Sequence, residues 1–191
     1  MDIENCSAAV LAGGLSTRMG RDKAALPLGG TTLLAHQVRK LRSLGIRDIM
    51  VSGSALPADH ARFVPDLFPR RGPLSGIHAC LLAAEREHVL FLPVDVPRVP
   101  SEALRALILA HAGGATVLRH GGKTEPLIGV YAKPLAAEAE ALLQTETTAV
   151  RRLLERTDAL AVEFAGEAAL LMNCNTPEAY EALRLAGIMP G

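Results

Sequence analysis

The sequence predicts an α/β fold, namely a Rossmann-like three-layer arrangement with a mostly parallel central sheet, helices on both faces and an antiparallel hairpin portion. Short apolar runs alternate with amphipathic stretches along the whole chain, as they do where helices pack on a parallel sheet. The 191 residues, of which 49% are hydrophobic, are enough to bury one continuous core. No linker, repeat or low-complexity tract divides them, so we expect a single domain over residues 1–191.

The first quarter of the chain predicts two buried strands joined by a helix. Residues 8–11 and 49–52 are short apolar runs, which are typical of strands in the middle of a sheet. Between them, apolar residues recur at helical spacing opposite polar ones, which predicts a helix over residues 33–44 with one solvated face. Gly45 follows and supplies the stop.

The middle of the chain predicts an extended connection, a helix and a third strand. Three prolines within residues 65–73 disfavour a helix, so we expect extended chain there, with a short strand near residues 63–64. Residues 75–84 place apolar side chains on one helical face, and residues 89–92 form a continuous apolar run typical of a central strand. The chain then turns through residues 93–97.

The second half of the chain begins with a helix and a hairpin. Ser101 is expected to cap a helix that runs to residue 112 and ends at two glycines. Residues 115–118 and 127–131 are apolar runs on either side of a glycine turn, which predicts an antiparallel hairpin. After the hairpin we expect helices over residues 135–143 and 148–155, a strand near residues 161–164 and a closing helix that Thr176 caps and that stops near Gly187.

The composition excludes several classes of function. Lys+Arg and Asp+Glu both number 20, so the chain has no general attraction for nucleic acid or for anionic membranes. Aromatic residues make up only 3%, which removes the stacking platforms of single-strand binders. No stretch approaches the ~20 apolar residues of a membrane span. Three distant cysteines and an acidic start unlike a secretory signal favour a reducing, cytoplasmic setting.

A glycine-rich loop directly follows the first predicted strand. Gly13 and Gly14, which follow Ala12, let the backbone pass close to a ligand. Arg18 and Lys23 supply positive charge suited to phosphate oxygens. The spacing matches neither GxxxxGK[ST] nor GxGxxG, so neither a Walker-type ATPase nor a Rossmann dehydrogenase is indicated. The loop therefore predicts a nucleotide site of another kind, and the alternative is a strand-to-helix turn with a solvated basic rim.

Asp95 lies just past the carboxyl end of a predicted strand, between Pro93 and Pro97. Ligands of open α/β sheets bind at this edge, so the position suits a carboxylate that holds Mg²⁺ beside a nucleotide. One protein carboxylate is enough, because Mg²⁺ keeps waters and phosphate oxygens in its octahedral shell. The alternative is an Asx turn or a cap on the following helix.

Two later segments present polar groups next to helix starts. Gly72 and Gly76 flank a predicted start whose exposed amides suit a planar base or an anion, and Asp66 lies six residues before Gly72. Asn173 and Asn175 carry amides that both donate and accept, just before the closing helix. Each segment also has a purely structural alternative. The first would be an ordinary loop that leads into a packed helix, and the second would be a pair of asparagines that form a turn.

Together, the runs LAGGLSTRMGRDKAAL, GPLSGI, LPVDVP and NCNTPE, in this order, resemble the molybdenum cofactor guanylyltransferases, within the nucleotidyltransferases of the sugar-nucleotide type. The resemblance covers nearly the whole chain. It implies a Mg²⁺-dependent transfer of GMP from GTP to the terminal phosphate of molybdopterin, with transient docking to molybdopterin-delivering proteins. Gly13, where cytidylyl-transferring relatives tend to carry alanine, favours guanine. One departure is Ser52-Gly53-Ser54, where many members carry Asn.

The resemblance also implies roles for single residues. The nucleotide would contact Leu11, Ala12, Gly13, Gly14, Lys23, Ser52, Asp66, Gly72, Gly76 and Asp95. Asp95 would bind the magnesium ion, while Lys23 and Arg18 would stabilise the departing pyrophosphate. Asn173 and Asn175 would lie toward the pterin.

Two alternative functions would also fit the nucleotide-binding motifs. A cytidylyl, uridylyl or adenylyl transferase acting on another cofactor or sugar phosphate would keep the phosphate machinery and differ in its base and acceptor pockets. A catalytically inactive GTP-binding protein would keep the loop and be stabilised by Mg-GTP, yet show no turnover with any acceptor.

Overall fold

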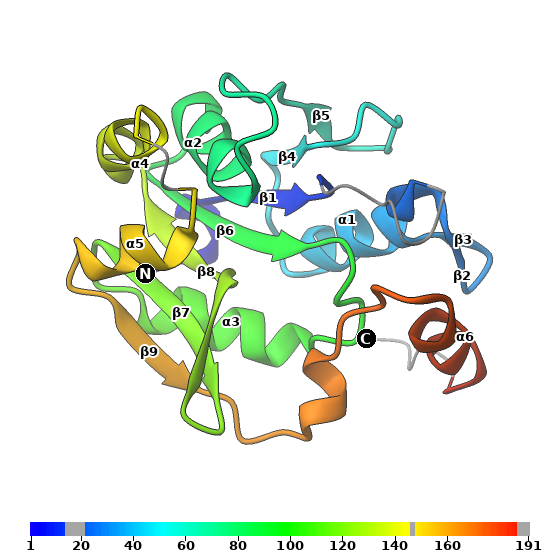
Figure 1. Cartoon of the computed structure of the whole chain (residues 1–191). Coiled ribbons are helices and arrows are strands. Elements are labelled where there is room, and N and C mark those ends of the chain that lie inside the picture. Colours follow the sequence, from blue (N-terminus) through cyan, green and yellow to red (C-terminus); the bar gives the residue numbers. More distant parts are fainter. Residues whose placement is uncertain (14–21, 146–147, 187–191) are drawn as a thin grey trace.

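A seven-stranded sheet with helices on both faces organises the chain (Figure 1). The computed structural model describes residues 1–13, 22–145 and 148–186. The strand order is β5 (Arg62–Phe63), β4 (Ile49–Ser52), β1 (Cys6–Leu11), β6 (His88–Pro93), β8 (Lys123–Ala132), β7 (Ala115–His120) and β9 (Leu160–Glu163). The predicted α/β class and mostly parallel sheet are therefore confirmed.

The four strands from β5 to β6 all run parallel, with β1 between β4 and β6. Leu11 at the end of β1 pairs in register with Ser52 on β4 and with Pro93 on β6. The carboxyl ends of these three strands thus meet at one edge, which is where ligands of such sheets bind. On the other side, β8 is antiparallel to both β6 and β7, and β9 is parallel to β7.

Two helical layers cover the sheet, because alternate residues of each strand point to opposite faces. Ala8 and Val10 of β1 pack into one layer with α1 (Leu33–Ser43) and α3 (Ser101–Ala110). Ala9 and Leu11 pack into the other layer, which contains α2 (Pro73–Ala83), α4 (Leu135–Leu143) and α5 (Val150–Glu155). Burial on both faces explains why the central strands are continuous apolar runs in the sequence.

The predicted start signals are confirmed at the first and last helices, as is the stop after the first; Gly187, the predicted stop of the last helix, lies outside the described residues. The Ala35 amide donates to Thr32 Oγ1 at 3.1 Å where α1 begins, and Gly45 follows its end with a φ of +99°. α6 (Pro177–Ala186) begins after Thr176, whose Oγ1 accepts from the Ala179 amide at 3.2 Å. Among the described helices, none has both the length and the apolar character of a bilayer span.

Three predicted helix starts are wrong by one or two residues. Ser101 does not cap α3: it is the first helical residue, and Pro100 occupies the cap position in an extended conformation. α2 starts at Pro73 rather than at residue 75, because proline is tolerated in the first turn and Gly72 adopts a φ of +67° before it. α5 starts at Val150 rather than at residue 148.

The predicted hairpin is present as β7 and β8, with a register shift between Val117 and Leu118. A second hairpin was not predicted: β2 (Pro27–Leu28) and β3 (Thr31–Thr32) flank a turn in which both glycines, 29 and 30, have positive φ. Three short 3₁₀-helices complete the described part of the chain, namely η1 (Ile3–Asn5), η3 (Lys23–Ala25) and η4 (Ala168–Leu171).

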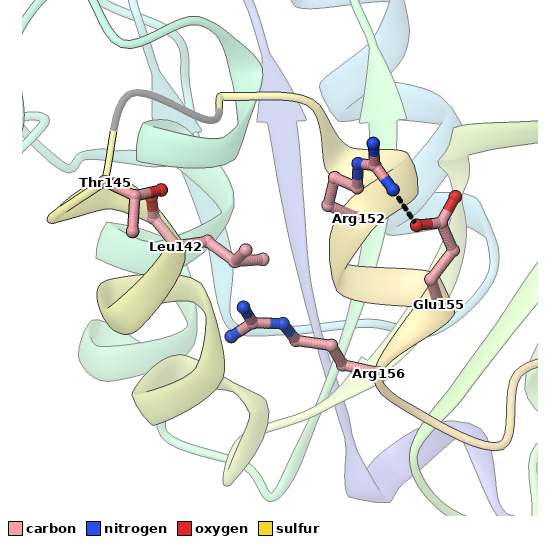
Figure 2. Close-up of a pocket in the computed structure, with 5 residues that line it drawn as sticks. All are labelled: Leu142, Thr145, Arg152, Glu155 and Arg156. Carbon is pink, nitrogen blue, oxygen red and sulfur yellow. Dashed lines mark hydrogen bonds and ion pairs between the residues drawn. The ribbon is translucent and has the colours of Figure 1, made fainter.

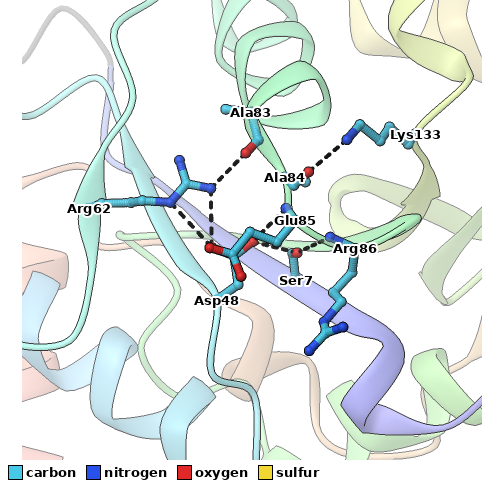
Figure 3. Close-up of polar contacts among 8 residues, drawn as sticks. All are labelled: Ser7, Asp48, Arg62, Ala83, Ala84, Glu85, Arg86 and Lys133. Atoms are coloured by element: carbon cyan, nitrogen blue, oxygen red, sulfur yellow. Dashed lines mark hydrogen bonds and ion pairs between the residues drawn. The ribbon is translucent and has the colours of Figure 1, made fainter.

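A buried carboxylate ties the strands together at the amino edge of the sheet (Figure 3). Asp48 accepts from Ser7 Oγ at 2.6 Å, from the Glu85 amide at 3.0 Å and from Arg62 Nη2 at 3.1 Å. Ser7 Oγ in turn accepts from the Arg86 amide. Burial alone would raise the pKa of Asp48, but these donors and the Arg62 charge hold that pKa below its usual value. We call Ser7, Asp48 and Arg62 the amino-edge brace.

Candidate functional site

The loops that leave β1, β4 and β6 are bonded to one another at the carboxyl edge of the sheet. The Ala12 amide donates to Ser52 O at 2.8 Å, and the Val94 amide donates to Leu11 O at 3.0 Å. The chain leaving β1 is therefore held between the chains leaving its two neighbours. The predicted glycine loop and Asp95 consequently emerge at the same edge.

Gly13 and Gly53 touch through their backbones. A Cβ atom on Gly53 would overlap the Gly13 Cα and amide nitrogen, and Gly53 has a φ of +85° that side chains rarely adopt. Gly13 itself is exposed, so its backbone remains open to a ligand. In this chain the Ser52-Gly53-Ser54 segment thus fits against the glycine loop only because its middle residue lacks a side chain.

Ser52, Asp66 and Gly76 form one contact group beside this pair. Ser52 Oγ donates to Asp66 Oδ1 at 2.7 Å. A Cβ atom on Gly76, in the first turn of α2, would overlap the Ser52 hydroxyl. Gly72 precedes α2 at its cap position, where an added Cβ would meet Thr148 at 3.9 Å. Three segments that are distant in sequence therefore converge where the resemblance predicts the nucleoside.

Lys23 stands on a turn that Asp22 holds from both sides. Asp22 Oδ1 accepts from the Ala24 amide at 2.9 Å and so caps η3, while Asp22 Oδ2 accepts from Ser54 Oγ at 3.1 Å. The turn is thereby attached to the loop after β4. Sequence reasoning missed both Asp22 and Ser54, although an Asp before a short helical turn is a recognisable capping signal.

The Lys23 ammonium reaches across to Asp95 and Asn175. Lys23 Nζ lies 3.4 Å from Asp95 Oδ2, and it also donates to Asn175 Oδ1. The two charged side chains are only 19% and 21% exposed, so solvent screens their attraction less than at an open surface. The structure thus brings together three predicted site residues that are up to 152 positions apart in sequence.

The segment before α6 packs directly against the Asp95 backbone. The Cys174 amide donates to Asp95 O at 2.8 Å. Burial, and the Asp95 charge after it, raises the pKa of the Cys174 thiol to about 11, so this thiol is neutral at pH 7. Asn175 faces Lys23, whereas Asn173 is exposed. Of the remaining predicted site residues, Gly14 and Arg18 lie outside the described residues.

The oxygen atoms of Asp95 fit a hard divalent cation. A carboxylate is the ligand type that Mg²⁺ prefers, and this one is partly exposed, with Lys23 as its side-chain partner. Within residues 1–13, 22–145 and 148–186, no cluster of three or more His, Cys, Asp or Glu side chains could hold a metal. The donor set therefore suits a cation that takes most of its ligands from water and from a bound phosphate.

A separate hollow of about 350 Å³ lies between α4 and α5 (Figure 2). The side chains that line it are Leu142, Thr145, Arg152, Glu155 and Arg156. Arg152 pairs with Glu155 at 2.7 Å, and Arg156 pairs with Glu138 at 3.5 Å. No lining residue belongs to the predicted site. All four charged partners are about half exposed, so solvent screens the ion pairs that the lining residues make.

Comparison with known proteins gives a consistent match. The family model of the MobA-like NTP transferase domain matches residues 8–162. The chain is 33% identical to a probable molybdenum cofactor guanylyltransferase of Carboxydothermus hydrogenoformans, over 95% of this chain and 96% of the relative. It is 35% identical to the molybdenum cofactor guanylyltransferase of Rhizobium johnstonii and 37% identical to that of Pseudomonas paraeruginosa, and over 90% of each chain is covered.

Solved structures share the fold at lower identity. The molybdopterin-guanine dinucleotide biosynthesis protein A of Archaeoglobus fulgidus superimposes with a TM-score of 0.78 at 24% identity, covering 94% of this chain and 97% of that one. A Mycobacterium tuberculosis protein solved in complex with manganese gives a TM-score of 0.71 at 18% identity, covering 95% and 98%. At these sequence identities, the structural similarity shows a shared fold and nothing about function.

Proposed function

Because this chain belongs to the MobA-like NTP transferase family, we propose that it is a molybdenum cofactor guanylyltransferase, which joins GMP from GTP to the terminal phosphate of molybdopterin and releases pyrophosphate. Full-length relatives of that name support the substrates. The observation that carries the proposal is the meeting of Lys23 with Asp95 at the edge where the glycine loop emerges. In this proposal the whole chain acts as one nucleotidyltransferase domain, which receives its pterin from a delivering protein.

The reaction brings two anions together, so the site must neutralise charge and hold the reacting groups in line. The attacking phosphate is already ionised at neutral pH, since its second pKa is about 6, and neither a general base nor a covalent nucleophile is needed. Lys23, joined by Arg18, would stabilise the charge that develops on the departing pyrophosphate. Asp95 would hold Mg²⁺. When bound, this ion supplies positive charge and a template for phosphate oxygens.

The nucleotide would lie along the three converging loops. The residues proposed to contact it are Leu11, Ala12, Gly13, Gly14, Lys23, Ser52, Asp66, Gly72, Gly76 and Asp95. The open backbone at Gly13 leaves room for a purine nucleotide. Ser52 orients the Asp66 carboxylate through their hydrogen bond, in place of the Asn that many relatives carry.

The acceptor would approach from the side of the segment before α6. Asn173 is exposed there and would face the pterin. Asn175 accepts from Lys23, and it would therefore link the acceptor side of the site to the phosphate-binding lysine.

A product assay tests the proposal. The protein is incubated with GTP, Mg²⁺ and molybdopterin, and we expect mass spectrometry to detect GMP-linked pterin together with stoichiometric pyrophosphate. Parallel reactions replace GTP with CTP, UTP or ATP and the pterin with sugar phosphates. GMP or another nucleotide joined to a sugar phosphate, with no pterin product, would identify a transferase with a different acceptor. GTP binding without any product would identify an inactive nucleotide-binding protein.

A further inference from the structure

We propose that Gln37 and Lys40 are positioning residues for Asp95, because from helix α1 they hold the backbone of the loop that carries this carboxylate. The loop comprises residues 94–100, between the end of β6 and the start of α3. The inference rests on the proposed function, in which Asp95 binds Mg²⁺. Nothing in the motifs that carry the family resemblance includes either residue.

The loop cannot satisfy its own buried carbonyl groups. Val94, Val96 and Val99 are buried, so water reaches the adjoining backbone poorly. Pro97 and Pro100 have no N–H to donate. The backbone bond within the loop runs from the Val99 amide to Val96 O at 3.3 Å. Since buried carbonyl groups need a donor, the remaining ones must find it on a neighbouring element.

Gln37 supplies donors on both sides of Asp95. Its side chain is fully buried, and Nε2 donates to Pro93 O at 2.8 Å and to Val96 O at 3.3 Å. One amide group therefore fixes the chain two residues before Asp95 and one residue after it. Gln37 Oε1 has no hydrogen-bond partner among the described residues, so the donor half of the amide is what this buried side chain contributes.

Lys40 continues the support along the same loop. Its Nζ donates to Pro97 O at 2.6 Å and to Val99 O at 2.7 Å, and His36 Nε2 lies 3.1 Å from the same Pro97 oxygen. Burial lowers the pKa of Lys40 to about 8, so the ammonium is still mostly protonated at pH 7. Lys40 is only partly exposed, and its charge is directed at two loop carbonyls.

The same helix also supports Lys23. The Leu33 amide at the start of α1 donates to Leu26 O, directly after the η3 turn, at 2.9 Å. Ala24 and Leu26 pack into one core layer with Leu33 and Leu34. α1 thus holds the lysine turn at its beginning and the Asp95 loop along its buried face, which fixes the spacing between the two charged groups.

The test measures how much Mg²⁺ strengthens GTP binding. GTP is titrated calorimetrically into the full chain with excess Mg²⁺ and again with EDTA, and the ratio of the two dissociation constants gives the metal enhancement. Gln37→Leu and Lys40→Met are expected to lower this enhancement about tenfold, the usual effect of removing groups that orient a metal ligand, while affinity in EDTA is unchanged. Arg39→Met, on the exposed side of α1, is the matched control and should keep the wild-type ratio. Asp95→Asn should abolish the enhancement.

Three outcomes would overturn the inference. An unchanged enhancement in both variants, with Asp95→Asn still effective, would refute positioning and leave the proposed function standing. An equal loss of affinity with and without Mg²⁺ would show that the residues only stabilise the fold. No enhancement in the wild type would remove the magnesium role of Asp95 and the inference with it. Both variants are expected to fold, because one replaces a partly satisfied amide and the other removes a buried charge. If a thermal melt shows that one variant is unfolded, the metal enhancement of the other variant tests the inference.

Discussion

A single ammonium group joins two parts of the candidate site, since Lys23 Nζ contacts both Asp95 and Asn175. Replacing Lys23 with Ala is expected to lower kcat at least about 10²-fold, which is the usual loss when one well-placed electrostatic donor is removed. Asp95→Ala should lose more, because the metal would be lost with the carboxylate. The measurement is the initial rate of pyrophosphate release with saturating GTP and molybdopterin. Turnover like the wild type in Asp95→Ala, with Mg²⁺ the only metal present, would contradict the assignment.

Substitutions at Gly53 and Gly30 can separate the cost of a positive φ from the cost of steric overlap. Gly53→Ala places a Cβ on the Gly13 backbone at a φ of +85°, so we expect lower stability and weaker GTP binding. Gly30→Ala is the matched control, since Gly30 has a similar φ of +78° but open space around it. The control should cost about 1 kcal/mol from its conformation alone and leave GTP binding intact. Urea unfolding and calorimetry measure both effects, and equal losses in the two variants would count against the backbone contact.

At this scale the sequence predicts charged groups better than the contacts between them. Lys23 and Asp95 could be identified because phosphate and magnesium require a cation and a carboxylate at the ends of strands. The Ser52 to Asp66 and Ser54 to Asp22 hydrogen bonds could not, because they depend on how two loops approach one another across the sheet edge. The same holds for Gln37, a polar residue that a hydropathy pattern assigns to the solvated face of α1 but that is fully buried on the same face as Leu34 and Leu41.

Among the structural elements, the amino-edge brace holds β1, β4 and β5 together. Asp48→Ala is expected to lower the free energy of unfolding by about 3 kcal/mol, because it leaves the buried Ser7 hydroxyl and the Glu85 amide without their acceptor. Arg119→Ala, which breaks the exposed pair with Glu163, should cost less than about 1 kcal/mol. Urea unfolding measures both. kcat of folded Asp48→Ala should match the wild type, and a large fall in kcat would show that the brace also shapes the site.

Element boundaries show where periodicity succeeds as a predictor. The central strands and α1 follow from apolar runs and helical spacing, because both faces of the sheet and one face of the helix are buried. The start of α3 was misplaced since Pro100, and not the hydroxyl of Ser101, occupies the cap position. The β2–β3 hairpin was missed because strands of two residues are too short to show an alternating pattern, although the intervening Gly-Gly pair is a turn signal.

For the molecule as a whole, the buried His111, paired with a partly exposed His88, predicts how stability depends on pH. His111 Nε2 lies 3.0 Å from His88 Nδ1, and His111 Nδ1 lies 3.0 Å from Thr116 Oγ1. Burial, followed by His88 and the N-terminal ammonium, lowers the pKa of His111 to about 4. Between pH 6.5 and 4, His111 is therefore protonated in the unfolded chain but stays neutral in the folded protein. The free energy of unfolding should fall by about 2 kcal/mol across this window as the pH is lowered.

Urea unfolding at a series of pH values measures this dependence. His111→Phe removes the titrating group, so its stability should fall less steeply between pH 6.5 and 4 than that of the wild type. His60→Asn, at an exposed position with a φ of +66°, is the control and should retain the wild-type slope. Parallel curves for wild type and His111→Phe would rule out His111 as the source.

The overall architecture was the most predictable level, because it depends on the order of apolar runs rather than on any single contact. The mixed character of the sheet was also predicted, from the glycine turn between the two strands of the β7–β8 hairpin. The hollow between α4 and α5 was not, since it arises where two helices distant from the motifs leave a gap in their packing.

The amino-edge brace and the candidate site share strands β1 and β4 and lie at opposite ends of them. Substitutions that make the protein more heat-resistant can therefore be collected at one end while the other end is altered to accept a new base or a new acceptor. A family built on this plan can diversify its substrates without first losing its ability to fold, and an engineer can follow the same route.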